Sequence, residues 1–184
     1  MLPFTALAAQ AQFNYTFTYQ TGQVYMPLPA TMISVNDTTV WDAEDYGFLL
    51  PFSFQWNKGI NTNAMVLALG FPGILPDSNY RNAPYASGFS AGAFGDLIDK
   101  GLPMGFSESP IRTQITGTAP NRIYKLEIRN AGFYDEYDAS GSFTDSTSFQ
   151  YWLYEGSNVL EMRYGPSSVQ NLGIYYPYGG PTVL

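Results

Sequence analysis

The chain has 184 residues, with no Cys, no His, 17% aromatic residues and only 12% charged residues. This composition excludes a disulfide scaffold, thiol catalysis, zinc sites built from Cys and His, and a Ser-His-Asp triad. Fifteen acidic residues against eight basic ones give a net charge of −7. That charge argues against nucleic acid and against an anionic membrane surface as partners.

The N-terminal 36 residues carry no charge. Residues 1–11 form a short apolar stretch that ends in Ala-Gln-Ala, a pattern typical of signal-peptide cleavage sites. No basic residue precedes this stretch, and a bilayer span needs about 20 apolar residues. We interpret residues 1–11 as the remnant of a signal peptide and expect a secreted or cell-surface protein without a membrane span. Residues 12–184 are expected to form a single domain that is cut short at its C-terminal end.

In the first half, residues 13–19 alternate aromatic and polar side chains, which predicts a half-buried strand. Residues 46–56 predict a second strand with alternate side chains facing the core, and Pro51 within it indicates an edge or a bulge. Residues 63–70 predict a buried strand. The Gly- and Pro-rich stretch 71–105 predicts long loops, with pairing of residues 87–94 and one helical turn at 96–101.

The second half alternates more regularly. Residues 112–118, 121–131, 148–155 and 159–164 each predict a strand. The side chains expected to face the core are Leu126, Ile128, Phe149, Tyr151, Leu153, Leu160, Met162 and Tyr164. Those expected to face outward are Lys125, Glu127, Arg129, Trp152 and Tyr154. Strands at this spacing, without long helical periodicity, predict an all-β fold: an antiparallel β-sandwich or jelly-roll-like domain with little helix.

Three segments of the second half carry a family resemblance. They are Thr-Ala-Pro-Asn-Arg at 118–122, Phe-Gln-Tyr-Trp-Leu-Tyr-Glu at 149–155 and Asn-Val-Leu-Glu-Met-Arg-Tyr-Gly at 158–165. Together they resemble β-sandwich modules in secreted proteins of the Bacteroidetes, which often carry a sorting domain for type IX secretion. More distantly, the layout is similar to nidogen-like domains. The resemblance implies an extracellular module joined to other domains of a larger secreted protein, with no activity defined by the motif.

Acidic residues cluster in two predicted loops. Asp135, Asp138 and Asp145 lie in one of them, and residues 42–45 hold three acids in the other. Because calcium takes six to eight oxygen ligands from such loops, the first cluster is a candidate calcium site, although no EF-hand pattern is present. The alternative is a solvated acidic loop with no cofactor.

Tyrosines also cluster outside the predicted strands, at Tyr80, Tyr85, Tyr175, Tyr176 and Tyr178. Exposed tyrosines stack on sugar rings and contact proteins, so these residues are candidate ligand-binding residues for glycans or surface proteins. The alternative is that they fill the core.

A third cluster, Glu127, Glu155 and Glu161, lies on or near strands expected to be neighbours. A carboxyl pair of this kind is what a glycosidase uses, but basic neighbours would keep these carboxylates ionised. The sequence therefore predicts a non-catalytic extracellular module for binding or adhesion. Two alternatives stay open: a carbohydrate-active enzyme with paired Glu residues, and a structural spacer domain.

Overall fold

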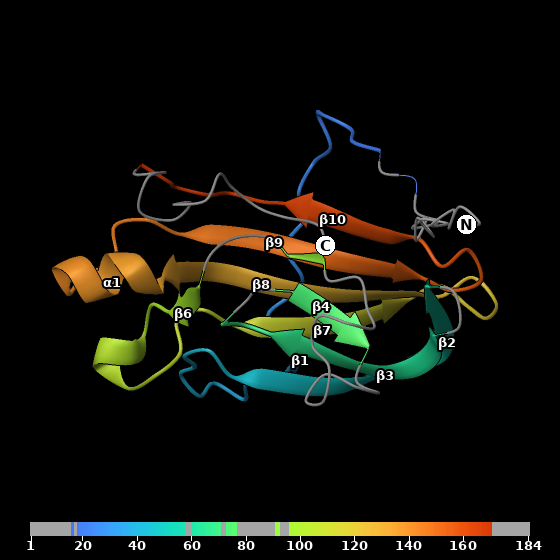
Figure 1. Cartoon of the computed structure of the whole chain (residues 1–184), viewed down its shortest axis with the longest axis horizontal. Coiled ribbons are helices and arrows are strands. Elements are labelled where there is room, and N and C mark those ends of the chain that lie inside the picture. Colours follow the sequence, from blue (N-terminus) through green and yellow to red (C-terminus); the bar gives the residue numbers. More distant parts are fainter. Residues whose placement is uncertain are drawn as a thin grey trace, which may run out of the picture.

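The computed structural model describes residue 16 and residues 18–57, 60–70, 73–76, 91–92 and 96–170. In this part of the chain the strands form two sheets, one of six strands and one of four, and every pairing is antiparallel. Figure 1 shows the long strands of the two sheets running side by side along the molecule. The predicted all-β sandwich is confirmed.

The larger sheet has the strand order β1-β7-β8-β9-β10. Its strands are β1 (Ile33–Ser34), β7 (Ile111–Thr116), β8 (Ile123–Phe133), β9 (Thr147–Tyr154) and β10 (Leu160–Tyr164). Strand β8 is long enough to take a further partner, β6 (Leu97–Asp99), beyond the end of β7. Asn130, in the left-handed region at φ 56°, lies at the irregularity of β8 that separates the two pairings.

The β6 pairing corrects one prediction. Residues 96–101 were expected to form a helical turn, but Leu97 and Ile98 are both fully buried, as a strand covered on both faces requires. Buried Asp99 then organises the chain that follows: its Oδ1 accepts hydrogen bonds from the backbone N–H groups of Gly101 and Glu108, at 2.7 and 3.0 Å. A short 3-10 helix, η2 (Leu102–Met104), lies inside this turn.

The smaller sheet has the order β2-β3-β4-β5. Its strands are β2 (Asp45–Asn57), β3 (Ile60–Ala68), β4 (Gly73–Pro76) and β5 (Ala91–Gly92). The register of β2 against β3 shifts between Leu49 and Phe54, which confirms the irregularity that Pro51 predicts. Because Pro has no N–H to donate, the ladder cannot continue unbroken through it.

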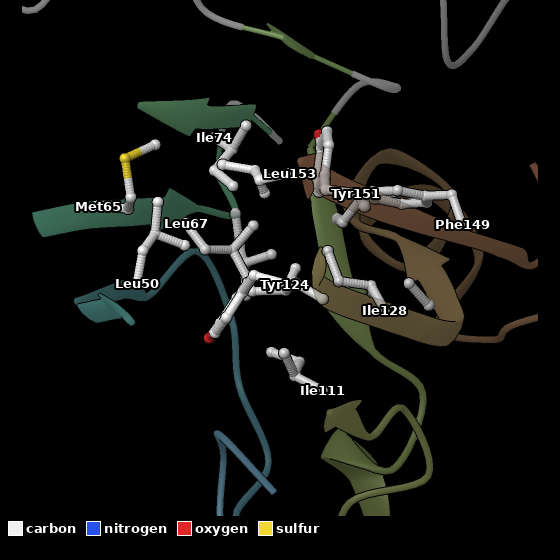
Figure 2. Packing of buried hydrophobic residues seen from close by; sticks show 14 of the residues in the cluster. Leu50, Met65, Leu67, Ile74, Ile111, Tyr124, Ile128, Phe149, Tyr151 and Leu153 are labelled. Carbon is white, nitrogen blue, oxygen red and sulfur yellow. The ribbon is translucent and has the colours of Figure 1, made fainter. Parts of the chain in front are cut away.

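The core lies between the two sheets (Figure 2). Figure 2 shows Leu67 of the smaller sheet beside Tyr124 of the larger one, and both belong to the buried cluster. The predicted core faces of β2, β8 and β9 are confirmed. On β10, Leu160 and Met162 pack against the core, whereas Tyr164 at the end of the strand is 53% exposed.

The helix α1 (Tyr134–Ser140) stands where the sequence predicted an acidic loop. Acidic residues in its first turn and Gly141 at its C-terminal end, at φ 67°, are typical helix signals. Glu136 of the helix is buried and accepts hydrogen bonds from the backbone N–H groups of Thr144 and Asp145, at 3.0 and 3.1 Å. This carboxylate ties the helix to the loop that leads into β9.

Of the strand predicted at residues 13–19, residues 13–15 and 17 lie outside the described part of the chain, and the rest does not form a strand. Residues 18–20 are not in a strand, and Tyr19 is 81% exposed. Instead, the segment that we call the strap, residues 21–32, crosses the larger sheet on the side away from the core; it is the blue trace in Figure 1. Leu28 of the strap is buried. The strap therefore covers part of a sheet face that alternation alone marks as solvent-facing.

Candidate functional site

Charged and aromatic side chains gather on the face of the larger sheet that points away from the core. Strand pairing places Lys125 opposite Trp152, and Glu127 opposite Gln150. On the flanking strands, Arg112 is opposite Glu127, Glu161 is opposite Trp152, and Arg163 is opposite Gln150. We call this set, with Arg129 and Tyr154, the outer face. Its backbone positions are fixed by the hydrogen-bonded ladder of four strands.

At the centre of the outer face, Trp152 is held by two cations. Lys125 Nζ lies 3.9 Å from the centroid of the Trp152 ring system, and Arg163 Cζ lies 3.5 Å from it. The two cations come from β8 and β10, the strands on the two sides of β9. Trp152 Nε1 donates a hydrogen bond to Gln150 Oε1 at 2.8 Å, and Arg163 Nε donates one to Glu161 Oε1 at 2.8 Å. The indole is thus fixed in position and polarised by its neighbours.

Beside this cluster, Glu127 is buried under the strap with no exposed surface. Its Oε1 accepts hydrogen bonds from the Tyr25 hydroxyl at 2.7 Å, the Leu28 backbone N–H at 3.0 Å and Gln150 Nε2 at 2.8 Å. Gln150 Nε2 also donates to the Met26 carbonyl at 2.8 Å. Burial, followed by the hydrogen bond to Glu127, raises the pKa of Tyr25 well above its ordinary value. Both groups are built into a polar layer between the strap and the sheet.

Two buried atoms near this layer have no hydrogen-bond partner among the described residues: Glu127 Oε2 and Arg112 Nη1. They belong to residues directly opposite one another on β8 and β7. Burial lowers the pKa of Arg112, the positive charge of Arg129 lowers it further, and Glu127 acts in the opposite sense. Arg129 is therefore close enough to repel Arg112, and Glu127 is a counter-charge to Arg112.

The outer face is positively charged although the chain is acidic overall. It holds four cations, Arg112, Lys125, Arg129 and Arg163, and two carboxylates, Glu127 and Glu161. Four positive charges minus two negative charges leave a local charge of +2, on a chain whose net charge is −7. Burial lowers the pKa of Lys125, and the nearby Arg163 lowers it further. The repulsion between Lys125 and Arg163 favours an added negative group beside them.

Each of the three glutamates from which a catalytic carboxyl pair could be drawn takes part in another interaction. Glu155 binds Arg122 at 2.6 Å, and this hydrogen bond lowers the pKa of Glu155 to about 2. Glu127 and Glu161 lie on β8 and β10 with β9 between them, and both accept hydrogen bonds. A glycosidase acid needs a raised pKa so that it holds a proton to donate. The pKa of Glu155 is lowered instead, so this carboxyl group does not hold a proton to donate.

The predicted calcium ligands lie in different environments. Asp135 and Asp138 are exposed on α1, whereas Asp145 is buried and accepts hydrogen bonds from Ser168 Oγ and the Gln170 backbone N–H, both at 2.9 Å. Within the described part of the chain, no group of three or more His, Cys, Asp or Glu residues is placed to hold a metal ion. Calcium binding stays a prediction.

A different carboxylate near α1 has an unusual environment. Burial raises the pKa of Asp96 to about 6, and the charges of Asp42 and Asp135 add to the effect. Asp96 Oδ1 is buried without a hydrogen-bond partner among the described residues. The folded chain therefore favours the protonated form of this side chain.

The five tyrosines predicted to bind ligands, Tyr80, Tyr85, Tyr175, Tyr176 and Tyr178, lie outside the described residues. The loop-borne aromatic surface accordingly stays a prediction. Sequence reasoning placed Trp152, Tyr154 and Lys125 on the outward side but did not connect them as one site. The available signal was strand parity together with the spacing of Glu161 and Arg163, which lie two positions apart on one strand.

A shallow hollow of about 550 Å³ lies at the irregular pairing of β2 and β3. It is lined by residues 50–53 and 61–63, none of which titrates. Hydroxyl and amide groups from Ser53, Asn61 and Thr62 supply its polar lining. The hollow has the chemistry of a weak polar contact surface and lacks an acid or base for catalysis.

Comparison with known families identifies the class of protein. The model of the NIDO-related family matches residues 14–175, so the chain belongs to that family. A nidogen-related domain fits an extracellular module of a larger protein, as the resemblance implied. No curated protein and no solved structure matches the chain significantly. Among the described residues, no helix has the length and apolar character needed to cross a membrane.

Proposed function

We propose that this NIDO-related domain is a non-catalytic binding or adhesion module of a secreted or cell-surface protein, with glycans or surface proteins as its ligands. One observation carries the proposal: the outer face presents ordered cations and a half-buried indole, held by strand pairing and cation–π contacts. Binding sites hold their side chains in this pre-ordered way because less conformational entropy is then lost when the ligand arrives.

The acid-base chemistry of the same face supports binding over catalysis. The hydrogen bond from Arg122 lowers the pKa of Glu155, and Glu127 Oε1 is occupied by three hydrogen-bond donors of the strap and of β9. A general acid in a hydrolase needs the reverse arrangement, in which the protonated form is favoured.

We also propose type IX secretion in a member of the Bacteroidetes as the export route, because the segments at 118–122, 149–155 and 158–165 resemble modules of such proteins. The test is to express the full parent protein in strains with and without a functional type IX system. Surface or medium localisation only in the competent strain supports this route. Equal export from both strains contradicts it.

The binding proposal is tested with a glycan array and a panel of extracellular proteins, each probed with the purified domain with and without calcium. Binding to any member supports the proposal, and calcium dependence would add the predicted metal site. Failure to bind in either condition contradicts the proposal and favours a structural spacer. Release of reducing sugar from a bound glycan would instead establish a carbohydrate-active enzyme.

A further inference from the structure

We propose that the outer face recognises acidic glycans, with a carboxylate or sulfate group received by Lys125 and Arg163 beside the half-buried Trp152. This inference rests on the proposed binding function and names the ligand class of that site. Three features of the outer face support it: an uncompensated charge, the electrostatics of the indole ring, and the shape of the face.

The first feature is the charge left over at Trp152. The described residues contain two ion pairs, Arg122 with Glu155 and Arg163 with Glu161. Neither pair includes Lys125. Its ammonium group contacts the indole of Trp152, and no carboxylate of the described residues lies within ion-pair distance of it. Because Arg163 is close enough to lower the pKa of Lys125, the pair repels itself, and a bound anion would relieve that repulsion.

The second feature is the charge distribution of the aromatic ring. An indole is negative on its faces and positive around its edge. Cations from β8 and β10 already lie over the ring, which leaves little of its face for a sugar to stack on. Trp152 is nevertheless half-buried rather than covered. An anionic group that approaches the ring edge would meet positive charge there, with an ammonium and a guanidinium close by.

The third feature is the shape of the face, which favours a glycan over a peptide or a nucleic acid. Strands β8 and β9 are paired on both sides at this point, so their backbone groups cannot add an extended peptide as a further strand. Among the described strands of the site, β10 alone ends the strand order, and Lys125 and Trp152 do not lie on it. A nucleic acid brings a dense line of phosphates, which a chain of net charge −7 repels beyond the local charge of +2. A glycan carries isolated acidic groups among hydroxyls, which matches one cationic site on a flat polar sheet.

The test is a titration of the domain with a sialylated oligosaccharide that carries one carboxylate, with an oligosaccharide that carries one sulfate group, and with a neutral malto-oligosaccharide. Intrinsic fluorescence is a suitable readout, because Trp41 and Trp56 are 0% and 1% exposed, so Trp152 is the accessible tryptophan of the described residues. We expect binding of at least one acidic oligosaccharide, weakening as salt is added, and no comparable binding of the neutral one. The two acidic arms distinguish carboxylate from sulfate recognition.

Variants locate the site. K125Q and R163Q should each weaken acidic binding roughly tenfold or more, because each removes a charge-assisted contact. The matched control K100Q removes a cation elsewhere, near Asp145, and should leave binding unchanged. E161Q removes the carboxylate that competes for Arg163, so it should tighten binding severalfold. A gain of affinity cannot come from a variant that has failed to fold.

The outcomes separate this inference from the function on which it rests. Acidic binding that is unaffected by K125Q, R163Q and E161Q overturns the outer face as its site. Binding of neutral glycans alone overturns the ligand class and leaves the binding function standing. Failure to bind any glycan on the array or any member of the protein panel overturns both.

Discussion

Removing the carboxylate of Glu127 is expected to destabilise the fold strongly, because three donors share its Oε1 as their acceptor and two of these hydrogen bonds are buried. Each intramolecular hydrogen bond contributes about 1 kcal/mol, more when one partner is charged, and a donor left unpaired in the interior costs a similar amount again. The variant also relieves the cost of burying a charge, which offsets part of the loss. For E127A we therefore expect a decrease of roughly 3 kcal/mol in the free energy of unfolding.

The measurement is urea unfolding followed by tryptophan fluorescence, with hydrogen exchange of the strap as a local readout. E127A should accelerate exchange at the Leu28 backbone N–H, which donates directly to Glu127. E127Q keeps the shape but removes the charge opposite Arg112, so it should fall between E127A and the wild type. The control is E161A, because Glu161 is 33% exposed and its pair with Arg163 is worth at most about 1 kcal/mol.

Two results would refute this reasoning. One is an E127A variant no less stable than E161A, which would mean that the strap does not depend on the buried carboxylate. The other is a lower free energy of unfolding without faster hydrogen exchange in the strap. This result would mean that Glu127 stabilises the sheet itself and not the contact between the sheet and the strap.

Three further predictions concern other parts of the chain. D96N should stabilise the domain at about pH 8 and not at about pH 4. Burial and neighbouring carboxylates raise the folded-state pKa of Asp96 to about 6, above its unfolded value, so the wild type loses stability as pH rises from the unfolded pKa to the folded one. Thermal melts of both proteins at the two pH values check this. G101A should be much more destabilising than G105A, because a Cβ on Gly101 would lie 1.8 Å from the Phe106 carbonyl oxygen. A Cβ on Gly105 would meet open space, and only the φ of 76° would be strained; equal decreases in melting temperature for the two variants would contradict this prediction. Because burial raises the pKa of Tyr25 above its unfolded value, the stability that it contributes should be lost as pH rises past about 10, and a Y25F variant should show a smaller alkaline loss in urea titrations at stepped pH.

Local patterns predicted the parts of the fold that local physics decides. Alternation at Phe149, Tyr151 and Leu153 identified a buried strand face correctly, because side chains on a strand point to opposite sides in turn. Pro51 identified the break in the β2 ladder for an equally local reason. The helix α1 was missed although its signals, acids in the first turn and a following Gly141, were present in the sequence.

The remainder of the site depends on contacts between distant residues. Alternation predicts that Glu127 faces outward, and it does, but residues about a hundred positions earlier cover it. No local pattern reports such a crossing. The same holds for residues 96–101: their periodicity fits a turn, yet Leu97 becomes a strand residue because the far end of β8 offers an unpaired edge. Long-range pairing overrides local preference at both places.

The strap has a practical consequence for shortening this domain. By strand positions alone, a minimal version would start at β1, at Ile33. Such a version would lack the Tyr25 hydroxyl and the Leu28 backbone N–H that bind Glu127, and the Met26 carbonyl that binds Gln150. Both buried side chains would then be exposed to water. A shortened recombinant version should therefore begin no later than residue 24, which lies before the first strand, β1.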